Sequence, residues 1–309
     1  MEFLPDEVVT EVKDYVMFKP NNKEELQKAI NLWCEDNDEA LKKYGNISLW
    51  NVSLITDMSF LFHNKKNFND DISNWDISNV KDMEYMFERA VTFNQPLNNW
   101  DVSNVTNMQS MFCNASDFNQ PLNDWDVSNV RDMTEMFIRA IKFNQPLNNW
   151  NVSNVKFMCG MFRECENFNQ PLDNWDVSKV KNMSLMFRQC NKFNQPLNNW
   201  NVSKVESMLS MFYECLNFNQ PLNNWDVSNV EHMGHMFQLM GLFNQSLDNW
   251  DVSNVKNMSY MFDKSMNFNQ NLNVWNVSHD CNTTSMFEEI PFYNKKENKP
   301  HWIEYTINH

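Results

Sequence analysis

Carboxylate side chains recur along this chain at a fixed interval, so they are the first candidates for chemistry. Every 25 residues one position carries Asp or Asn, and six of these are acidic: Asp76, Asp101, Asp126, Asp176, Asp226 and Asp251. Paired carboxylates act as acid and base only when different environments separate their pKa values, and a repeat gives each copy a similar environment. We interpret the column as a ladder of Asx side chains that stabilises the fold. The alternative is an acidic strip that binds cations or a basic partner.

Histidine and cysteine offer no convincing ligand set. His232 and His235 are three residues apart without an obvious third ligand, so we expect them to be solvent-exposed. None of the seven cysteines forms a CxxC pair, and Cys165, Cys190 and Cys215 occupy a 25-residue column that elsewhere holds Ala. We expect buried thiols there. No GxSxG motif or phosphate-binding loop occurs, and the sequence therefore predicts no catalytic residue, no cofactor, no metal and no enzymatic activity.

A 25-residue repeat organises all of these positions. Trp recurs without a change of interval from Trp50 to Trp275, and each copy is followed by Asp or Asn, then Val or Ile, then Ser. Residues 118–137 show a typical unit. A unit this short cannot enclose a core alone, so neighbouring units must stack into a solenoid.

The pattern within one unit predicts one strand and one helix. Trp125 and Val127 alternate with polar residues, which is typical of a short strand. Ser128 then stands where a helix N-cap belongs. An apolar stripe follows at spacings of three and four, as in an amphipathic helix: Val130, Met133, Met136, Phe137 and Ala140. Strands step by about 4.8 Å and helices by about 8–10 Å. We therefore expect a curved α/β solenoid with a parallel sheet on its concave face, where the acidic strip faces outward.

A second Asn column precedes the Gln-Pro pairs. It runs through Asn69, Asn94, Asn119, Asn144, Asn169, Asn194, Asn219, Asn244 and Asn269. Because a buried polar group must be paired, we expect a buried ladder that fixes the loops between helix and strand.

The whole register resembles that of a known family. The run Trp-Asp-Val-Ser-Asn-Val-x-x-Met-x-x-Met-Phe-x-x-Ala-x-x-Phe-Asn-Gln-Pro-Leu is similar to the BspA-like leucine-rich-repeat family in its 25-residue surface-lipoprotein form, over about residues 44–290. The resemblance implies a right-handed, leucine-rich-repeat-like α/β solenoid that mediates adhesion or protein interaction without catalysis. Members include bacterial surface proteins and proteins of protists and large DNA viruses. The start of this chain lacks a leader or lipoprotein Cys, which favours an intracellular, cytoplasmic location or a virion.

Both ends depart from the repeat. Residues 1–46 predict a helical N-terminal cap, with one helix near Pro5 and another that begins at Asn22, has Glu25 placed for a capping box, and ends at Gly45. Residues 4–9 also resemble the opening of an F-box. Residues 47–290 form the repeat region, and residues 291–309 form a C-terminal cap or tail rich in aromatic residues.

Composition limits the partners. A formal net charge of -15 and the lack of a basic run argue against nucleic acid and against anionic membrane surfaces, so the expected partner is a protein. Apolar residues that vary from coil to coil are the candidate partner surface: Tyr85, Ile138, Phe157, Leu185, Leu209, Tyr213, Leu239 and Tyr260. The sequence thus favours a non-enzymatic interaction scaffold. Two alternatives stay open: a structural virion component of the minor capsid or cement type, and an F-box-like adaptor of a ubiquitin ligase.

Overall fold

Two short helices open the part of the chain that the computed structural model describes, residues 17–295 and 298–304. Helix α1 is Lys23–Glu35, and the side chain of its N-cap, Asn22, accepts a hydrogen bond from the Glu25 amide at 3.0 Å. The predicted start at Asn22 is therefore confirmed. The helix buries four apolar residues: Leu26, Ala29, Ile30 and Trp33. The helix expected near Pro5 lies outside the described residues.

The stretch expected to be a single helix up to Gly45 is divided at Asp36. This residue takes a non-helical conformation, and its side chain accepts a hydrogen bond from the Glu39 amide at 3.0 Å. Helix α2, Asn37–Tyr44, therefore has its own N-cap. It ends at Gly45, whose φ of 71° lies in the left-handed region that glycine adopts easily.

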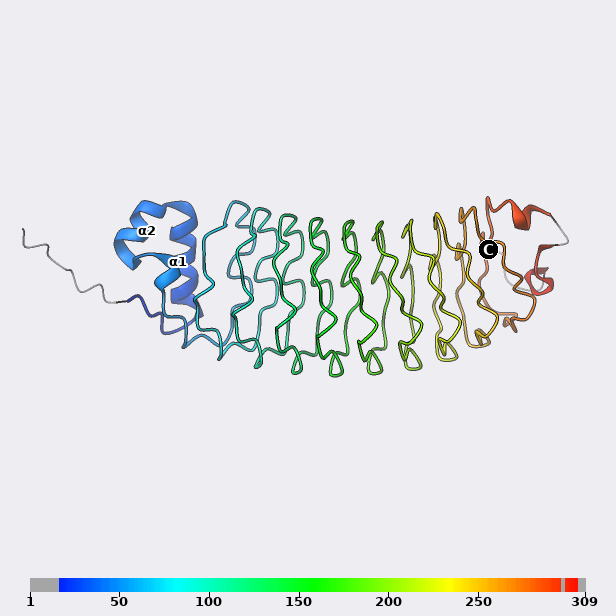
Figure 1. Ribbon diagram of the computed structural model, residues 1–309, viewed down its shortest axis with the longest axis horizontal. Coiled ribbons are helices and arrows are strands. Elements are labelled where there is room, and N and C mark those ends of the chain that lie inside the picture. The colour runs from blue at the N-terminus through cyan, green and yellow to red at the C-terminus, as the bar shows by residue number, and fades with distance from the viewer. Residues whose placement is uncertain (1–16, 296–297, 305–309) are drawn as a thin grey trace, which may run out of the picture.

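The 25-residue units follow as a row of stacked coils (Figure 1). The short 3₁₀ helix η1, Ile47–Leu49, leads into the first coil, and η2, Phe292–Asn294, and η4, His301–Glu304, lie at the far end. We name each coil after the Trp at which it starts, so the Trp125 coil is residues 125–149. The molecule is elongated along the stack, with the two helices at one end.

The predicted α/β solenoid with a strand and a helix in each coil is wrong. Between η1 and η2 the described chain contains neither an α-helix nor a β-strand. The expected parallel sheet is reduced to single parallel bridges between neighbouring coils, such as Asp132 with Phe157. There is consequently no concave sheet on which an acidic strip could lie, and Ser128 caps no helix.

Each coil is instead a succession of tight turns. In the Trp125 coil, amides at 130, 136, 138, 140 and 143 each donate to the carbonyl three residues earlier, at 2.9–3.3 Å. Glu135 and Arg139 have φ values of 58° and 55°. In the described chain, every non-glycine residue with positive φ occupies one of these two positions of its coil. Such residues are typical of turns that need a left-handed third residue, and they replace the helix.

The remaining amides of this segment join neighbouring coils. Met133, Glu135, Phe137 and Arg139 donate to the carbonyls of residues 157, 159, 161 and 163 in the next coil, at 2.8–3.0 Å. Alternate amides thus bond within the coil and between coils. Backbone polar groups near a core need partners, and this alternation supplies them without a regular strand or helix.

Aromatic stacks form the core and explain why no helix fits. Ring centroids of Trp125 and Trp150 are 6.4 Å apart, and neighbouring rings of the column from Phe62 to Phe287 are 5.3–5.9 Å apart. Two packed helices need about 8–10 Å between their axes. The Trp side and the Phe side of the core repeat at closely similar spacings, and both are shorter than the spacing of packed helices. Each coil can therefore be built from turns but not from a helix.

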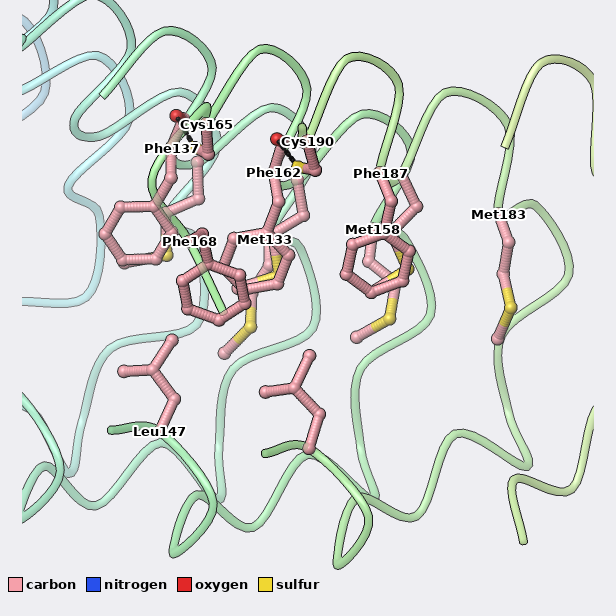
Figure 2. Packing of buried hydrophobic residues seen from close by; sticks show 14 of the residues in the cluster. Met133, Phe137, Leu147, Met158, Phe162, Cys165, Phe168, Met183, Phe187 and Cys190 are labelled. Carbon is pink, nitrogen blue, oxygen red and sulfur yellow. Dashed lines mark hydrogen bonds between the residues drawn. The ribbon is translucent and has the colours of Figure 1, made fainter. Parts of the chain in front are cut away.

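Sulfur-containing side chains fill the space beside these rings. Figure 2 shows Met133, Met158 and the thiols of Cys165 and Cys190 among the Phe and Leu side chains. The two thiols donate to the carbonyl oxygens of residues 137 and 162 in the previous coil, at 2.7 and 2.8 Å. Cys165, Cys190 and Cys215 are fully buried and free, so the prediction of buried thiols in this column is confirmed.

The Trp column also links the coils, because indoles along it donate to carbonyl oxygens 28 residues earlier in the chain. The indole Nε1 of Trp150 donates to the Leu122 carbonyl at 2.8 Å, and Trp175 bonds Leu147 in the same way at 3.0 Å. At the C-terminal end Trp302 stacks on Trp275 with ring centroids 6.3 Å apart. Trp302 therefore extends the Trp column beyond the last complete coil. Within the described residues, neither helix is long and apolar enough to cross a membrane.

Candidate functional site

The acidic column is a set of turn caps. Oδ1 of Asp101 accepts a hydrogen bond from the Ser103 amide at 3.0 Å. The same contact occurs at the other five carboxylates, Asp76, Asp126, Asp176, Asp226 and Asp251. Hydrogen bonds from the serine side chain and backbone lower the pKa of Asp101, and the same bonds act on Asp176 and Asp251. Each carboxylate thus forms an Asx turn within its own coil, a turn that Asp and Asn side chains favour.

The second Asn column forms a ladder, as predicted, although it is half-buried and joins no helix to a strand. The Asn144 amide donates to Asn119 Oδ1 at 2.9 Å. In turn, Asn144 Oδ1 accepts from the Asn169 amide at 2.9 Å and from Gln170 Nε2 at 3.1 Å. These side chains therefore link consecutive coils.

The histidines and the remaining thiols do not converge on a metal or a nucleophile. His232 is exposed, whereas His235 is half-buried, lies 2.6 Å from Gln238 Oε1 and stacks on Tyr260. Within the described residues, no group of three or more His, Cys, Asp or Glu side chains is arranged to hold a metal ion. Burial raises the pKa of the Cys159 thiol.

One surface carries the residues that the repeat does not dictate. It is formed by the positions 7, 9, 10 and 13 residues after each Trp. The ideal Cβ position of Gly234 lies 3.1–3.3 Å from side chains at positions 7 and 9 of the neighbouring coils, and that of Gly160 lies 3.7–3.9 Å from side chains at position 13. Tyr85 Oη accepts from Gln109 Nε2 at 3.1 Å, which joins positions 10 and 9. These four columns thus form one continuous surface.

Five of the predicted partner-surface residues differ widely in exposure on this surface. Phe157 is 54% exposed and Leu209 is 36% exposed, whereas Ile138 is buried at 7%. Tyr85 and Tyr260 are half-buried and stack on Phe60 and His235.

The other three predicted residues are half-buried. Leu185 lies at position 10 and Tyr213 at position 13 of their coils, while Leu239 lies at position 14, beside the surface. The guanidinium of Arg188 lies over the Tyr213 ring at 4.2 Å. The structure therefore places four of the eight residues, Phe157, Leu185, Leu209 and Tyr213, on three consecutive coils of one surface.

The coils from Trp150 to Trp225 give this surface a distinct centre, which we call the central face. It comprises Phe157, Cys159, Gly160, Arg163, Asn182, Ser184, Leu185, Arg188, Ser207, Leu209, Ser210, Tyr213, His232, Gly234, His235 and Gln238. None of these sixteen residues is acidic. The same columns in the four preceding coils carry six acids, and the two following coils carry Asp263 and Glu288. Although the chain has a net charge of -15, this region lacks the acidic side chains that the flanking coils carry in the same columns.

The central face also interrupts a structural rule of the repeat. At position 7 an Asx side chain normally accepts a hydrogen bond from the amide two residues later, as Asp132 does from Thr134 at 2.8 Å. Three coils have Phe157, Ser207 and His232 at this position instead, and all three lie within the central face. Departures from a local structural rule are expected where function competes with stability.

Comparison with known families assigns the chain. The family model described as "Mycoplasma protein of unknown function, DUF285" matches residues 17–149, 120–221 and 186–302. The chain belongs to this family. DUF285 is a BspA-like repeat family, so the resemblance based on the register is correct at that level. No curated relative matches the chain.

Sequence reasoning missed two features of the central face. It named the exposed apolar side chains but not Arg188, and it did not compare charge along each column. An alignment of the coils of this DUF285 repeat by their Trp residues shows that these columns carry no acidic residue from the Trp150 coil to the Trp225 coil. The F-box-like residues 4–9 lie outside the described residues.

Proposed function

We propose that this DUF285 protein is a non-enzymatic scaffold that binds another protein through its central face. The supporting observation is that acidic side chains are lost from these columns on four consecutive coils, and that three of the four also lack the Asx cap at position 7. A capping residue stabilises its own turn, so its replacement by the exposed Phe157 has no benefit for folding. An exposed aromatic side chain at the edge of a region without acidic residues is typical of a binding surface.

The relief of the central face supports the same function. Leu209 stands between Ser184 and Gly234 in its column, and both neighbours are buried beside it. Leu209 is therefore the bulky apolar side chain of this part of the column, and because it is 36% exposed, a partner can reach it. Charged residues are depleted at the core of protein interfaces, which matches the composition here.

The experiment compares two charge substitutions of exposed leucines. Leu209→Asp lies on the central face, whereas Leu242→Asp, at a residue 50% exposed, lies outside it and serves as the control. Tagged full-length variants are isolated gently from the native source with cross-linking, and co-isolated proteins are quantified by mass spectrometry. We expect Leu209→Asp to lose the proteins that the parent protein and Leu242→Asp retain.

Both variants are first compared by thermal unfolding, and we expect unchanged midpoints because both side chains are exposed. Equal recovery of co-isolated proteins by the two variants contradicts binding through the central face. A partner lost only with Leu242→Asp moves the interface to another side of the stack.

A further inference from the structure

An arginine without an ion pair lies at the centre of the proposed interface. Arg188 forms no ion pair with any described residue, and its Nε atom is buried without a hydrogen-bond partner. By contrast Arg163, one coil earlier in the same column, donates to Glu164 at 3.0 Å. The acceptor that a neighbouring coil offers, Glu214, is bonded to Gln189 at 3.0 Å instead.

The side chain of Arg188 is nevertheless held in place. Its guanidinium carbon lies 4.2 Å from the centre of the Tyr213 ring, a cation–π contact that orients the planar group. Arg188 is half-buried, so part of it stays accessible to a partner. A guanidinium that is already oriented loses less entropy when it binds a carboxylate, and its fork of N–H groups matches the two carboxylate oxygens.

The surroundings define the rest of the ligand. Leu185 lies three residues before Arg188, and Leu209 lies on the next coil. The central face has no acid to neutralise Arg188, while Phe157 and Leu209 are 54% and 36% exposed. A complementary segment therefore needs a carboxylate and bulky apolar side chains close together.

We propose that the central face binds a peptide segment of its protein partner that carries Asp or Glu beside bulky apolar residues, with Arg188 as the carboxylate anchor. This inference rests on the proposed function, because it assigns chemistry to the partner of the same face. The apolar residues supply contact area, and the single charge pair fixes the register of the segment.

The test begins with selection of random twelve-residue peptides displayed on phage, using the immobilised full-length protein. Selected sequences are synthesised in two forms, one with the natural Asp or Glu and one with Asn or Gln in its place. Fluorescence anisotropy then gives Kd values for the parent protein and for Arg188→Gln, Arg139→Gln and Leu209→Asp. Arg139→Gln is the matched control, because that arginine lies outside the central face and already has a carboxylate partner, Glu164.

The proposal predicts enrichment of acidic residues near large apolar ones. We expect Arg188→Gln to weaken binding of the acidic peptide about tenfold or more, the scale of a charge-assisted hydrogen bond, and Arg139→Gln to change it less than about threefold. The amide form should bind weakly and respond little to Arg188→Gln. This coupling between peptide and protein changes identifies a direct contact. If the glutamine variant does not fold, Arg188→Met, which also removes the charge, replaces it, and the same coupling is expected.

Two other results separate the two proposals. Peptides that lose affinity with Leu209→Asp but not with Arg188→Gln overturn the carboxylate anchor and leave the interface in place. If no peptide is enriched, or if enriched peptides are insensitive to Leu209→Asp, binding by the central face is overturned as well.

Discussion

Replacing one ladder asparagine tests how the coils are held together. Asn144→Ala removes Oδ1, which accepts from the Asn169 amide at 2.9 Å and from Gln170 Nε2 at 3.1 Å. The bond donated by the Asn144 amide itself survives, because it comes from the backbone. Two lost hydrogen bonds of about 0.5–1.5 kcal/mol each give a loss of about 1–3 kcal/mol in the free energy of unfolding.

Two variants of the same column provide controls. Asn144→Asp keeps an oxygen acceptor and should lose less than about 0.5 kcal/mol. Asn269→Ala lies at the last rung, where Oδ1 accepts no hydrogen bond within the described residues, and it should also lose less than about 0.5 kcal/mol. Urea unfolding measures all three values.

Hydrogen exchange locates the effect. The Asn169 amide should exchange faster in Asn144→Ala than in Asn144→Asp, because only the first variant removes its acceptor. Equal destabilisation by Asn144→Ala and Asn269→Ala, or unchanged exchange at Asn169, would refute the argument that the ladder links the coils.

Three further predictions concern the indole, the turn caps and the thiols. Trp150→Phe should cost about 1–3 kcal/mol, because the Leu122 carbonyl loses its buried donor; calorimetry measures this against the parent protein. Asp101 has a lowered pKa in the folded state. The stabilisation that its turn cap gives is therefore present above pH 3.8, the ordinary pKa of an Asp side chain, and is lost as the pH falls through the lower pKa of the folded state. The stabilisation by the Asp101 cap should therefore stay constant between pH 5 and 7 and decline below pH 3.8. Ser103→Pro, which removes the donating amide, should reduce that decline in urea titrations. Burial raises the pKa of the Cys190 thiol, so iodoacetamide at pH 8 should label it only after unfolding, as peptide mass spectrometry would show; labelling in the folded protein would contradict its burial.

The sequence predicted the register of the fold and most of its core. Trp150, Val152, Met158, Phe162 and the residues equivalent to them up to the Trp250 coil are buried, as their 25-residue spacing indicated. In the acidic column, the expected bonds to nearby backbone are those that Oδ1 accepts from the serine amides. These features follow from stacking alone, since a residue type that recurs in every coil meets the same neighbours in every coil.

The local conformation was predicted wrongly, and the reason is physical. Apolar spacings of three and four are typical of a helix, but successive turns with bonds between residues three apart produce the same spacing. Strands and helices step by different distances, and a curved solenoid was the expected way to accommodate that difference. The chain instead avoids it by placing residues such as Glu135 and Arg139 at positive φ.

The candidate partner surface could be predicted only in part. Phe157 and Leu209 were recognisable because they break an otherwise polar column. The stacking of Arg188 on Tyr213 was not, because it depends on how position 13 of one coil lies over position 13 of the next.

Site-specific photo-cross-linking tests the central claim most directly. A photoreactive amino acid is introduced at position 157 on the central face or at position 242 outside it, in the full-length protein within its native source. The account predicts that irradiation at position 157, and not at 242, joins the protein to one distinct partner. Adducts formed equally from both positions, or only from position 242, would contradict a binding function for the central face.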